Sequence, residues 1–328
     1  MASIKDVAKE AGVGVATVSR VLNESGYVSA DTKDKILKAM KKLNYTPNEL
    51  ARQLYRKKVG TVAVLMPDVA HPLFGELTRD IETFLYEKGY KTMICNTFKA
   101  ENSEQEYLSM LDKQIVDGII TGVHSLQIEA YLNIDKPIVA FDRYLGKAIP
   151  VVGANHVEGG KTAAKLLVDS GCTKVLQFVG SKSVDAPTHD RHIEFEKYMK
   201  KNNIEVISIE LEWNKHNSEY FESTTEKIMN QYPDVDGVFG TDMLTIYAMK
   251  TALKQNKKIP EELKIVSYDG SYITEAMTPS ITSVVQPVRL IAQNLVDMIC
   301  KMIDGEKCLE TRIQLATTVR IGETTTCR

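Results

Sequence analysis

Hydrophobic residues at the start of the chain recur with the period of an α-helix. Ser3 stands immediately before this run as a candidate N-cap, and Asp6, three residues later, completes a capping box. Gly12 predicts where the helix ends, because glycine readily adopts the left-handed conformation found there. The positions that share the apolar face of this first helix are Ile4, Val7, Ala8 and Ala11.

A second apolar pattern, at residues 15–22, predicts another short helix directly after the glycine turn. In this helix Val18, Val21 and Leu22 can pack on the first one. Two short helices joined in this way have the geometry of a helix-turn-helix, whose second helix fits the major groove of DNA. The positions left facing outward are Val15, Ala16, Thr17, Ser19 and Arg20.

These outward side chains have the chemistry of base and phosphate recognition. Arg20 can donate two parallel hydrogen bonds to guanine O6 and N7, while Val15 and Ala16 can contact thymine methyl groups. The alternative, from these residues alone, is a small helical hairpin within a larger fold, with Arg20 solvated. Short polar side chains suited to binding phosphates are Thr17, Ser19 and Asn23.

A third helix is predicted from about Ser29 to Leu43, capped by Ser29 or Asp31. Residues 44–48 then stop the helix and place a proline at the start of a new one. The segment 48–55 is so short that its helix should be marginal in isolation, which indicates a linker that becomes ordered on a surface. The inward positions predicted for the third helix are Ile36, Leu37, Met40 and Leu43.

From Val59 onward, short apolar strands alternate with amphipathic helices, which is typical of parallel sheets in doubly wound α/β domains. A repeated pattern, Val-Asp-Gly-Ile-Ile at 116–120 and Val-Asp-Gly-Val-Phe at 235–239, indicates two similar lobes. The predicted strands are Thr61–Met66, Thr92–Cys95, Gly118–Thr121, Pro137–Phe141, Lys174–Val179, Gly237–Phe239 and Lys264–Tyr268. The predicted helices include Glu76–Lys88, Glu104–Lys113, Gly159–Ser170 and Met243–Gln255.

Ligands of such sheets bind at the carboxyl ends of the strands. Carboxylates and an arginine beside aromatic rings suit a sugar, because they offer hydrogen bonds to hydroxyls and a flat surface for the sugar ring. Other roles stay open: His124 is equally suited to capping a loop, and Phe74 or Trp213 to the core. Asp142 and Asp269 are equally suited to capping helices. The candidate residues at these strand ends are Leu73, Phe74, His124, Asp142, Arg143, Asp185, Arg191, Trp213, Thr241, Asp242 and Asp269.

Charge is divided unevenly along the chain. Residues 1–58 contain 12 Lys and Arg against 6 Asp and Glu, a balance of +6, so with a net charge of −2 overall the remainder has −8. A basic N-terminal segment followed by an acidic remainder indicates that the N-terminal segment binds a polyanion and the remainder does not.

The composition, 43% hydrophobic and 26% charged, is that of an ordinary globular protein. No apolar run approaches the roughly 20 residues that cross a membrane, the N-terminus lacks the layout of a signal peptide, and the 5 cysteines show no CxxC spacing. We therefore expect a cytoplasmic protein with no membrane contact, metal or cofactor. Asp142 and Asp269 could supply acid–base chemistry, but without a nucleophile elbow or phosphate loop we expect no enzyme activity and no catalytic residues.

Together the motifs resemble the lactose-repressor (LacI/GalR) family over essentially the whole chain. The head signature is Ile-Lys-Asp-Val-Ala at 4–8, Gly-Val at 12–13 and Ala-Thr-Val-Ser-Arg-Val-Leu-Asn at 16–23. The hinge signature is Tyr-Thr-Pro-Asn at 45–48 and Ala-Arg-Gln-Leu at 51–54. The resemblance implies an allosteric transcription repressor that binds double-stranded, pseudo-palindromic operator DNA as a homodimer.

The resemblance also assigns roles within the DNA complex. Val15, Ala16 and Arg20 would read bases, while the hinge helices of two subunits pair in the minor groove. Ala51 would lie in that groove, and Leu54 would pry apart a central base step. Such an apolar wedge costs stacking energy but bends the duplex into more contact with the protein.

In the body, the resemblance implies a small sugar or sugar-phosphate effector between two lobes of the periplasmic-binding-protein type. Asp269 matches an aspartate that holds the effector in many members, and Arg191 matches an arginine at the lobe interface. Where several members have an effector-binding arginine, Asp185 stands here, which departs from the family pattern. Ile-Cys-Asn at 94–96 and Ala-Phe-Asp-Arg at 140–143 are most like Gram-positive sucrose-operon repressors, with ribose repressors as the nearest alternative.

The predicted domains are a helix-turn-helix DNA-binding domain at 1–47, a hinge helix and linker at 48–59, and an effector-binding and dimerisation domain at 60–328. Its first lobe would span about 60–158 and 288–317, and its second about 159–287 and 318–328. Two other functions fit this body. A solute-binding protein of a sugar transporter would need an export signal and no basic head. A global catabolite regulator with a protein corepressor would carry a basic docking residue where Asp297 stands.

Overall fold

The chain divides into two compact units, Met1–Gly60 and Thr61–Arg328, which we call the head and the body. The predicted hinge helix, with Ala51 and Leu54, lies outside the described residues, and so do His124 and Trp213. The computed structural model describes residues 2–23, 25–46, 58–97, 103–122, 129–132, 135–183, 185–212, 215, 217–306, 308 and 310–326.

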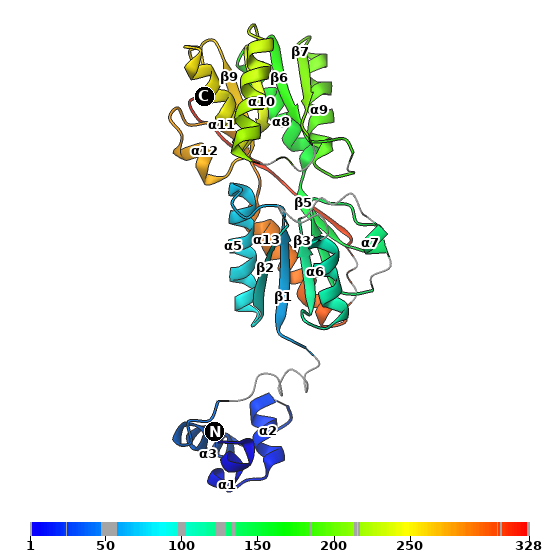
Figure 1. Ribbon diagram of the computed structural model, residues 1–328, viewed down its shortest axis with the longest axis vertical. Coiled ribbons are helices and arrows are strands. Elements are labelled where there is room, and N and C mark those ends of the chain that lie inside the picture. Colours follow the sequence, from blue (N-terminus) through cyan, green and yellow to red (C-terminus); the bar gives the residue numbers. More distant parts are fainter. Residues whose placement is uncertain are drawn as a thin grey trace. The chain divides into compact units, whose positions relative to one another are not determined.

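The described part of the head is formed by the helices α1 (Ile4–Ala11), α2 (Val15–Asn23) and α3 (Ala30–Lys42) (Figure 1). The predicted ends of α1 are confirmed. Ser3 and Asp6 form a capping box, and Gly12 has a φ of 66° at the C-terminus, where a side chain would be strained. The buried core of the head consists of Val7, Ala8, Val18, Ile36 and Ala39.

The prediction that Leu37 faces inward is wrong. Its side chain is 49% exposed, whereas Ile36 is fully buried and Ala39 occupies the inward position. Ile36 and Ala39 lie one turn apart on the face of α3 that packs in the core of the head, whereas Leu37 points about 100° away from Ile36 and reaches solvent. Of the two candidate caps, Ser29 is the N-cap of α3, and its hydroxyl accepts a hydrogen bond from the backbone of Thr32.

The body contains two sheets whose strands are parallel, except that β12 runs antiparallel to β10. Their orders are β11-β5-β4-β3-β1-β2 and β12-β10-β9-β8-β6-β7. The first lobe contains β1 (Thr61–Met66), β2 (Lys91–Asn96), β3 (Gly118–Thr121), β4 (Ile138–Phe141), β5 (Val151–Ala154) and β11 (Arg312–Leu315). The second lobe contains β6 (Lys174–Val179), β7 (Glu205–Glu210), β8 (Gly237–Thr241), β9 (Lys264–Asp269), β10 (Thr282–Val285) and β12 (Thr318–Arg320).

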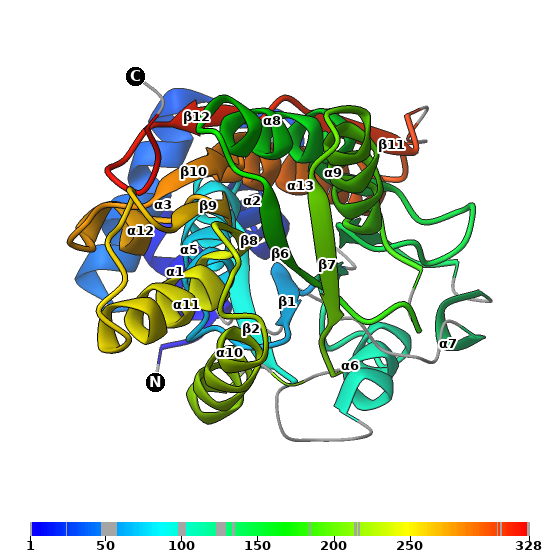
Figure 2. The same ribbon diagram turned by 90° about the horizontal axis from the view of Figure 1, so that it is seen from above.

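Helices cover both faces of each sheet, because alternate strand residues point to opposite faces. In β1, Val64 packs in the core cluster with α5 and α13, while Leu65 packs in the cluster with α6. Figure 2 shows β6 and β7 between α8 and α9 on one side and α10 and α11 on the other. Helices of the first lobe are α5 (Pro72–Glu87), α6 (Ser103–Asp112), α7 (Glu129–Leu132) and α13 (Val288–Ile303). Helices of the second lobe are α8 (His156–Asp169), α9 (His189–Lys201), α10 (Ser218–Gln231), α11 (Asp242–Lys254) and α12 (Tyr272–Ala276).

Each predicted strand is present, with its ends within two residues of the expected positions. The predicted helices are also present, although α5 begins four residues earlier than expected. Pro72 stands in its first turn, where the missing N–H of proline has no helical partner to lose.

The repeated Val-Asp-Gly pattern marks equivalent places in the two lobes. Asp117 precedes β3 and its carboxylate accepts a hydrogen bond from the backbone N–H of Thr61, at 3.3 Å. Asp236 precedes β8 and accepts from the backbone N–H groups of Thr173 and Lys174, at 2.8 and 3.0 Å. Each aspartate therefore ties the start of the neighbouring strand, and the prediction of two similar lobes is confirmed.

Ile36→Ala should destabilise the head by about 2–5 kcal/mol, because it leaves a cavity among fully buried side chains. Hydrogen exchange of peptides from residues 4–42, followed by mass spectrometry in the full chain, should become faster. Leu37→Ala is the matched control and should stay within about 0.5 kcal/mol of wild type. Equal acceleration in both variants would contradict the inward face assigned to α3.

Candidate functional site

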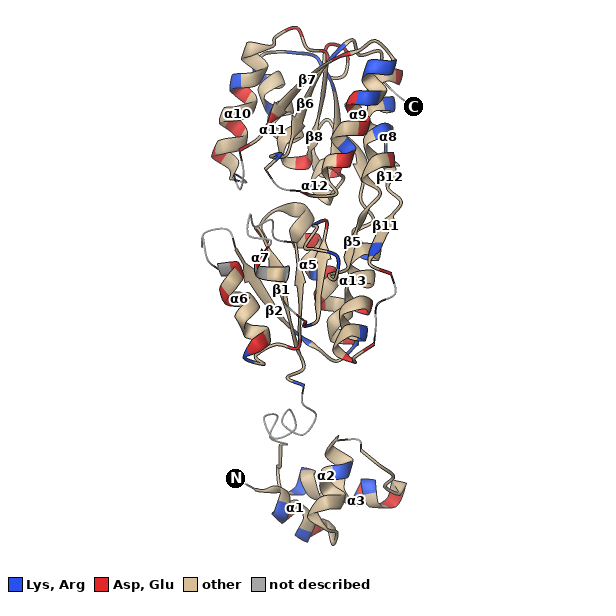
Figure 3. Ribbon diagram, turned by 90° about the vertical axis from the view of Figure 1, so that its right-hand side faces the viewer, with Lys and Arg blue, Asp and Glu red and all other residues tan. Residues whose placement is uncertain are grey.

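The exposed face of α2 carries the predicted DNA-contacting side chains. Val15 is 41% exposed, Ala16 and Arg20 are exposed, and Val18 on the opposite face is fully buried. Thr17, Ser19 and Asn23 are partly exposed, and the Asn23 amide donates a hydrogen bond to the Ser19 hydroxyl at 3.2 Å. Lys and Arg residues also lie on α1 and α3 (Figure 3). The face therefore combines apolar, polar and cationic groups on a helix that the remaining head supports from behind.

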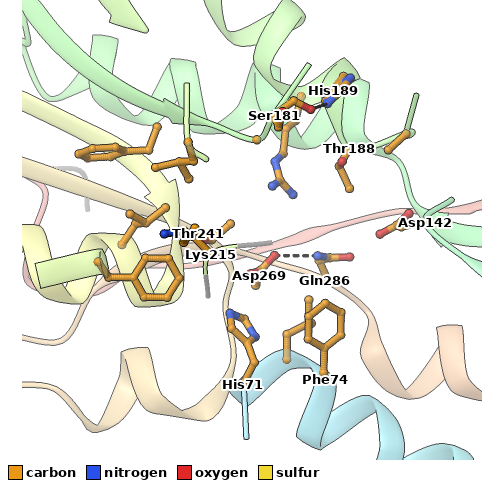
Figure 4. Close-up of a pocket in the computed structure, with 18 of the residues that line it drawn as sticks. His71, Phe74, Asp142, Ser181, Thr188, His189, Lys215, Thr241, Asp269 and Gln286 are labelled. Carbon is orange, nitrogen blue, oxygen red and sulfur yellow. Dashed lines mark hydrogen bonds between the residues drawn. The ribbon is translucent and has the colours of Figure 1, made fainter. Parts of the chain in front are cut away.

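A crevice of about 180 Å³ lies between the lobes, at the carboxyl ends of β4, β6, β8 and β9 and the start of α5 (Figure 4). Its polar lining consists of His71, Asp142, Ser181, Thr188, His189, Arg191, Glu212, Lys215, Thr241, Asp269 and Gln286. Its apolar lining includes Leu73, Phe74, Phe141, Phe178, Leu211, Phe221 and Leu244.

The crevice brings together some of the predicted effector residues but not others. Those that line it are Leu73, Phe74, Asp142, Arg191, Thr241 and Asp269. Asp185 does not: it is exposed and lies in a separate hollow beside Tyr144, Lys147 and Arg312. In the loop after β6, Ser181 and Ala186 face the crevice instead, because the loop turns Asp185 toward solvent.

Asp269 lies at the floor of the crevice in an unusual conformation. Its φ of 104° is in the region that favours glycine, so the surrounding loop must hold it there. The Gln286 side-chain amide donates a hydrogen bond to Asp269 Oδ1 at 2.8 Å (Figure 4). Burial, and then the nearby Asp242 carboxylate, raise the pKa of Asp269 to about 8.

The loop after β9 is held by Asp242 at the start of α11. This fully buried carboxylate accepts hydrogen bonds from the backbone N–H groups of Gly270 and Ser271, at 3.0 and 2.8 Å, and from the Ser267 hydroxyl. Asp242 therefore supports Asp269 and does not line the crevice. Ser271, and not Asp269, occupies the N-cap position of α12, so Asp269 is not a helix cap.

Arg191 reaches the crevice from α9 and is anchored on both sides. Its guanidinium carbon lies 4.5 Å from the centre of the Tyr268 ring. Its Nε donates a hydrogen bond to His192 Nε2 at 3.3 Å, and His192 Nδ1 lies 3.2 Å from the Gln177 side-chain oxygen. Burial and the adjacent Arg191 charge lower the pKa of His192 well below its usual range, which leaves its Nε2 free to accept.

Asp142 and Arg143, which follow β4, face different surroundings. Asp142 lines the crevice and also contacts His156 Nε2, at 2.9 Å. Arg143 is fully buried away from the crevice, where it pairs with Glu104 at 2.7 Å and lies over the Tyr131 ring. The N-cap of α8 is Asn155, so Asp142 is not a helix cap.

Aromatic rings form one wall of the crevice. Phe74 packs edge-on against Phe141, with ring centres 6.5 Å apart, and its ring centre lies 5.2 Å from that of His71. Phe74 is therefore half-buried and still borders the cavity. A rigid apolar wall opposite carboxylate and guanidinium groups can bind a molecule with one apolar face and several hydroxyls.

Several crevice residues were not predicted from the sequence, among them His71, Gln286 and Lys215. Gln286 follows β10, a strand whose carboxyl end also reaches the crevice, so the strand-end rule could have found it. No simple pattern marks Lys215, which comes from the loop between β7 and α10.

The described residues contain no group of three or more His, Cys, Asp or Glu side chains arranged to hold a metal ion. In that part of the chain, no helix combines the length and apolar character needed to cross a membrane.

Asp269 should make the stability of the body depend on pH. Since its pKa is higher in the folded protein than its ordinary 3.8, between about pH 4 and 8 the folded form holds a proton that the unfolded chain has released. The free energy of unfolding should therefore fall as the pH rises. The difference between wild type and Asp269→Asn, measured by denaturant titration, should shrink by up to about 1.4 kcal/mol per pH unit. A constant difference would contradict the raised pKa.

Comparison with known proteins matches both units of the chain. Residues 3–48 match the model of bacterial regulatory proteins of the lacI family, and residues 164–325 match a periplasmic binding protein-like domain. The chain is 40% identical to a sucrose operon repressor of Streptococcus mutans, covering 93% of this chain and 94% of that protein. It is 35% identical to a ribose operon repressor of Halalkalibacterium halodurans, covering 99% and 97%.

The fold also matches a solved structure. The Lac repressor bound to ONPG superposes with a TM-score of 0.84 at 23% identity, covering 99% of each chain. The predicted fold class, a helix-turn-helix head followed by two α/β lobes of the periplasmic-binding-protein type, is thereby confirmed. The chain belongs to the lacI family of bacterial regulatory proteins.

Proposed function

We propose that this protein is a sequence-specific repressor of a carbohydrate-utilisation operon, controlled by a small sugar or sugar phosphate in the crevice. The observation that carries the proposal is the pairing of two sites in one chain: the exposed face of α2 and a crevice with carboxylates, Arg191 and an aromatic wall. The relatives named as sucrose and ribose operon repressors are similar to this chain over nearly their whole length.

On DNA, α2 enters the major groove. Arg20 donates to a guanine, and Val15 and Ala16 contact thymine methyl groups. Thr17, Ser19 and Asn23 bind phosphates and set the orientation of the helix. The resemblance to the family adds Ala51 in the minor groove and Leu54 as the wedge between base pairs.

In the crevice, Asp269 and Asp142 accept hydrogen bonds from sugar hydroxyls, and Arg191 donates to others. Thr241 contributes a further hydroxyl, while Leu73 and Phe74 border the apolar face of the sugar ring. His124 and Trp213 remain candidates on the basis of sequence alone. Sucrose, fructose or a phosphorylated derivative is the favoured effector, because sucrose operon repressors are among the most similar relatives, and ribose is the alternative.

The body also forms the homodimer that places two heads on a pseudo-palindromic site. We assign residues 1–47 to the DNA-binding domain, 48–59 to the hinge and 60–328 to the body. The first lobe takes about 60–158 and 288–317, and the second about 159–287 and 318–328. An effector that binds one arrangement of the lobes more tightly than another shifts the population of the DNA-binding state by that difference in affinity.

The protein acts by binding and not by catalysis, as the repressors among its relatives indicate, and DNA binding requires it to work in the cytoplasm. A basic head disfavours a solute-binding protein of a transporter. The position where a global catabolite regulator would carry a basic docking residue is Asp297, which instead pairs with Lys88 at 3.0 Å. These features favour the sugar-controlled repressor.

Arg20→Ala should remove the preference for guanine at the contacted base pair. We expect this to weaken operator binding by about 1–3 kcal/mol. Lys38→Ala is the matched control, since Lys38 is an exposed cation on α3. Fluorescence anisotropy with an operator selected from random duplexes by the wild-type protein measures both. Equal weakening of operator and random DNA in both variants would show that Arg20 contributes only charge.

Asp269→Asn should weaken sugar binding by about tenfold, because it replaces one carboxyl oxygen by an amide NH2 group and leaves a buried hydrogen-bond partner unsatisfied, which costs roughly 1–3 kcal/mol. Calorimetry against sucrose, fructose, ribose and their phosphate esters, with and without operator DNA, identifies the effector and the sign of its coupling to DNA. Asp185→Asn is the matched control, because Asp185 lies outside the crevice, and it should bind as wild type. Loss of binding in both variants would refute the assignment of the crevice.

A further inference from the structure

A buried hydrogen-bonded chain joins the lobes beside the crevice. His156, the first residue of α8, places Nε2 2.9 Å from Asp142 Oδ1 and Nδ1 2.9 Å from the Tyr268 hydroxyl. Asp142 follows β4 in the first lobe, whereas Tyr268 lies in β9 of the second. We call these residues the interlobe chain; His156 and Tyr268 are fully buried and Asp142 is 3% exposed.

The distances in the interlobe chain are compatible with a proton on His156 Nε2 and a Tyr268 hydroxyl that donates to Nδ1. A carboxylate only accepts, so the proton between Asp142 and His156 belongs to Nε2. A neutral imidazole then has its lone pair on Nδ1, which accepts the hydroxyl proton of Tyr268. In this arrangement, each hydrogen bond of the interlobe chain joins one donor to one acceptor.

The backbone around the interlobe chain leaves room for it at two glycines. A Cβ on Gly153 would lie 1.8 Å from Asp142 Oδ1, and a Cβ on Gly159 would lie 2.5 Å from the Tyr268 hydroxyl oxygen. Asp142 itself has a φ of 48°, in the left-handed region. Backbone strain of this kind persists only where the surrounding structure imposes it. The orientation of Asp142 toward His156 is therefore built into the fold of both lobes.

Both ends of the interlobe chain reach the crevice. Asp142 lines it directly, and the Tyr268 ring supports the guanidinium of Arg191, which lines it as well. His156 is thus placed between an acceptor and a donor of the crevice although it does not line the crevice itself.

We propose that His156 is a positioning residue that ties the two lobes together and orients Asp142 for the effector. By occupying Oδ1 of Asp142 it leaves Oδ2 as the oxygen that accepts from a sugar hydroxyl, and by accepting from the Tyr268 hydroxyl it links Asp142 to β9 of the second lobe. The part concerning the effector rests on the proposed function, whereas the tie between the lobes does not.

Two substitutions separate the halves of the interlobe chain. In His156→Gln, the nitrogen of the new side-chain amide can take the place of Nε2 and keep the hydrogen bond to Asp142. In His156→Asn, the oxygen of the new side-chain amide can take the place of Nδ1 and keep the hydrogen bond donated by the Tyr268 hydroxyl. Tyr268→Phe removes only the hydroxyl, so a variant that retains the ring remains available if substitution of His156 prevents folding.

The first measurement requires no sugar. In the full-length protein with nitrogen-15-labelled histidine, NMR should show the His156 signals, identified by their loss in His156→Gln, with the proton on Nε2 and none on Nδ1. A proton on Nδ1, on both nitrogens or exchanging between them would overturn the arrangement. In addition, Tyr268→Phe should lower the unfolding midpoint of wild type but should not lower that of His156→Gln further. If Tyr268→Phe lowers the unfolding midpoint of His156→Gln as much as it lowers that of wild type, the proposed link between the lobes is wrong.

The second measurement tests the orientation of Asp142, with sucrose, D-fructose and D-ribose as probes in calorimetry. For whichever probe binds wild type, His156→Asn should weaken binding about tenfold, whereas His156→Gln should stay within about threefold. Equal weakening would overturn the positioning role. If no sugar binds wild type, the proposed effector class is wrong, and the NMR and unfolding results still decide whether the interlobe chain exists.

Discussion

A carboxylate is costly to bury unless hydrogen-bond donors surround it, and the crevice of this protein depends on meeting that requirement at the strand ends. Asp242 accepts from the backbone of Gly270 and Ser271 and so fixes the loop that follows β9. That loop holds Asp269 at a φ of 104°, with its carboxylate against Gln286. Asp242, which does not line the crevice, therefore determines where Asp269, which does line it, points.

The same requirement shapes the other side of the crevice. Asp142 is satisfied by His156 across the boundary between the lobes, and Arg191 is held between the Tyr268 ring and His192. Because the hydrogen bond between Asp142 and His156 joins residues of different lobes, it depends on how the two lobes are arranged. An effector that competes for, or adds to, these hydrogen bonds thereby gains a different affinity for different lobe arrangements, which is what allosteric control of DNA binding requires.

Local patterns predicted the head and the strands of the body well, because they depend on interactions between neighbours in sequence. The capping box at Ser3 and Asp6 and the left-handed Gly12 are confirmed, as are the predicted strands. The error at Leu37 came from a helix whose apolar residues are adjacent in sequence, so that periodicity could not tell which of them faces the core. Asp185 was placed in the crevice by its position after β6, but a loop can turn a side chain either way.

The sequence by itself determined the family, the helix-turn-helix and the alternation of strands and helices in the body, since motifs and hydrophobic periods are local features of the chain. It did not predict β5, β7, β10, β11 or β12. Only the tertiary structure decided which polar residues meet. Gln286 and Asp269 are 17 positions apart, and His156 and Tyr268 are 112 apart, yet each pair is joined by a hydrogen bond. Such contacts depend on which strands become neighbours, on how α8 packs against β9 and on whether Gly153 and Gly159 leave space, and no local pattern carries that information.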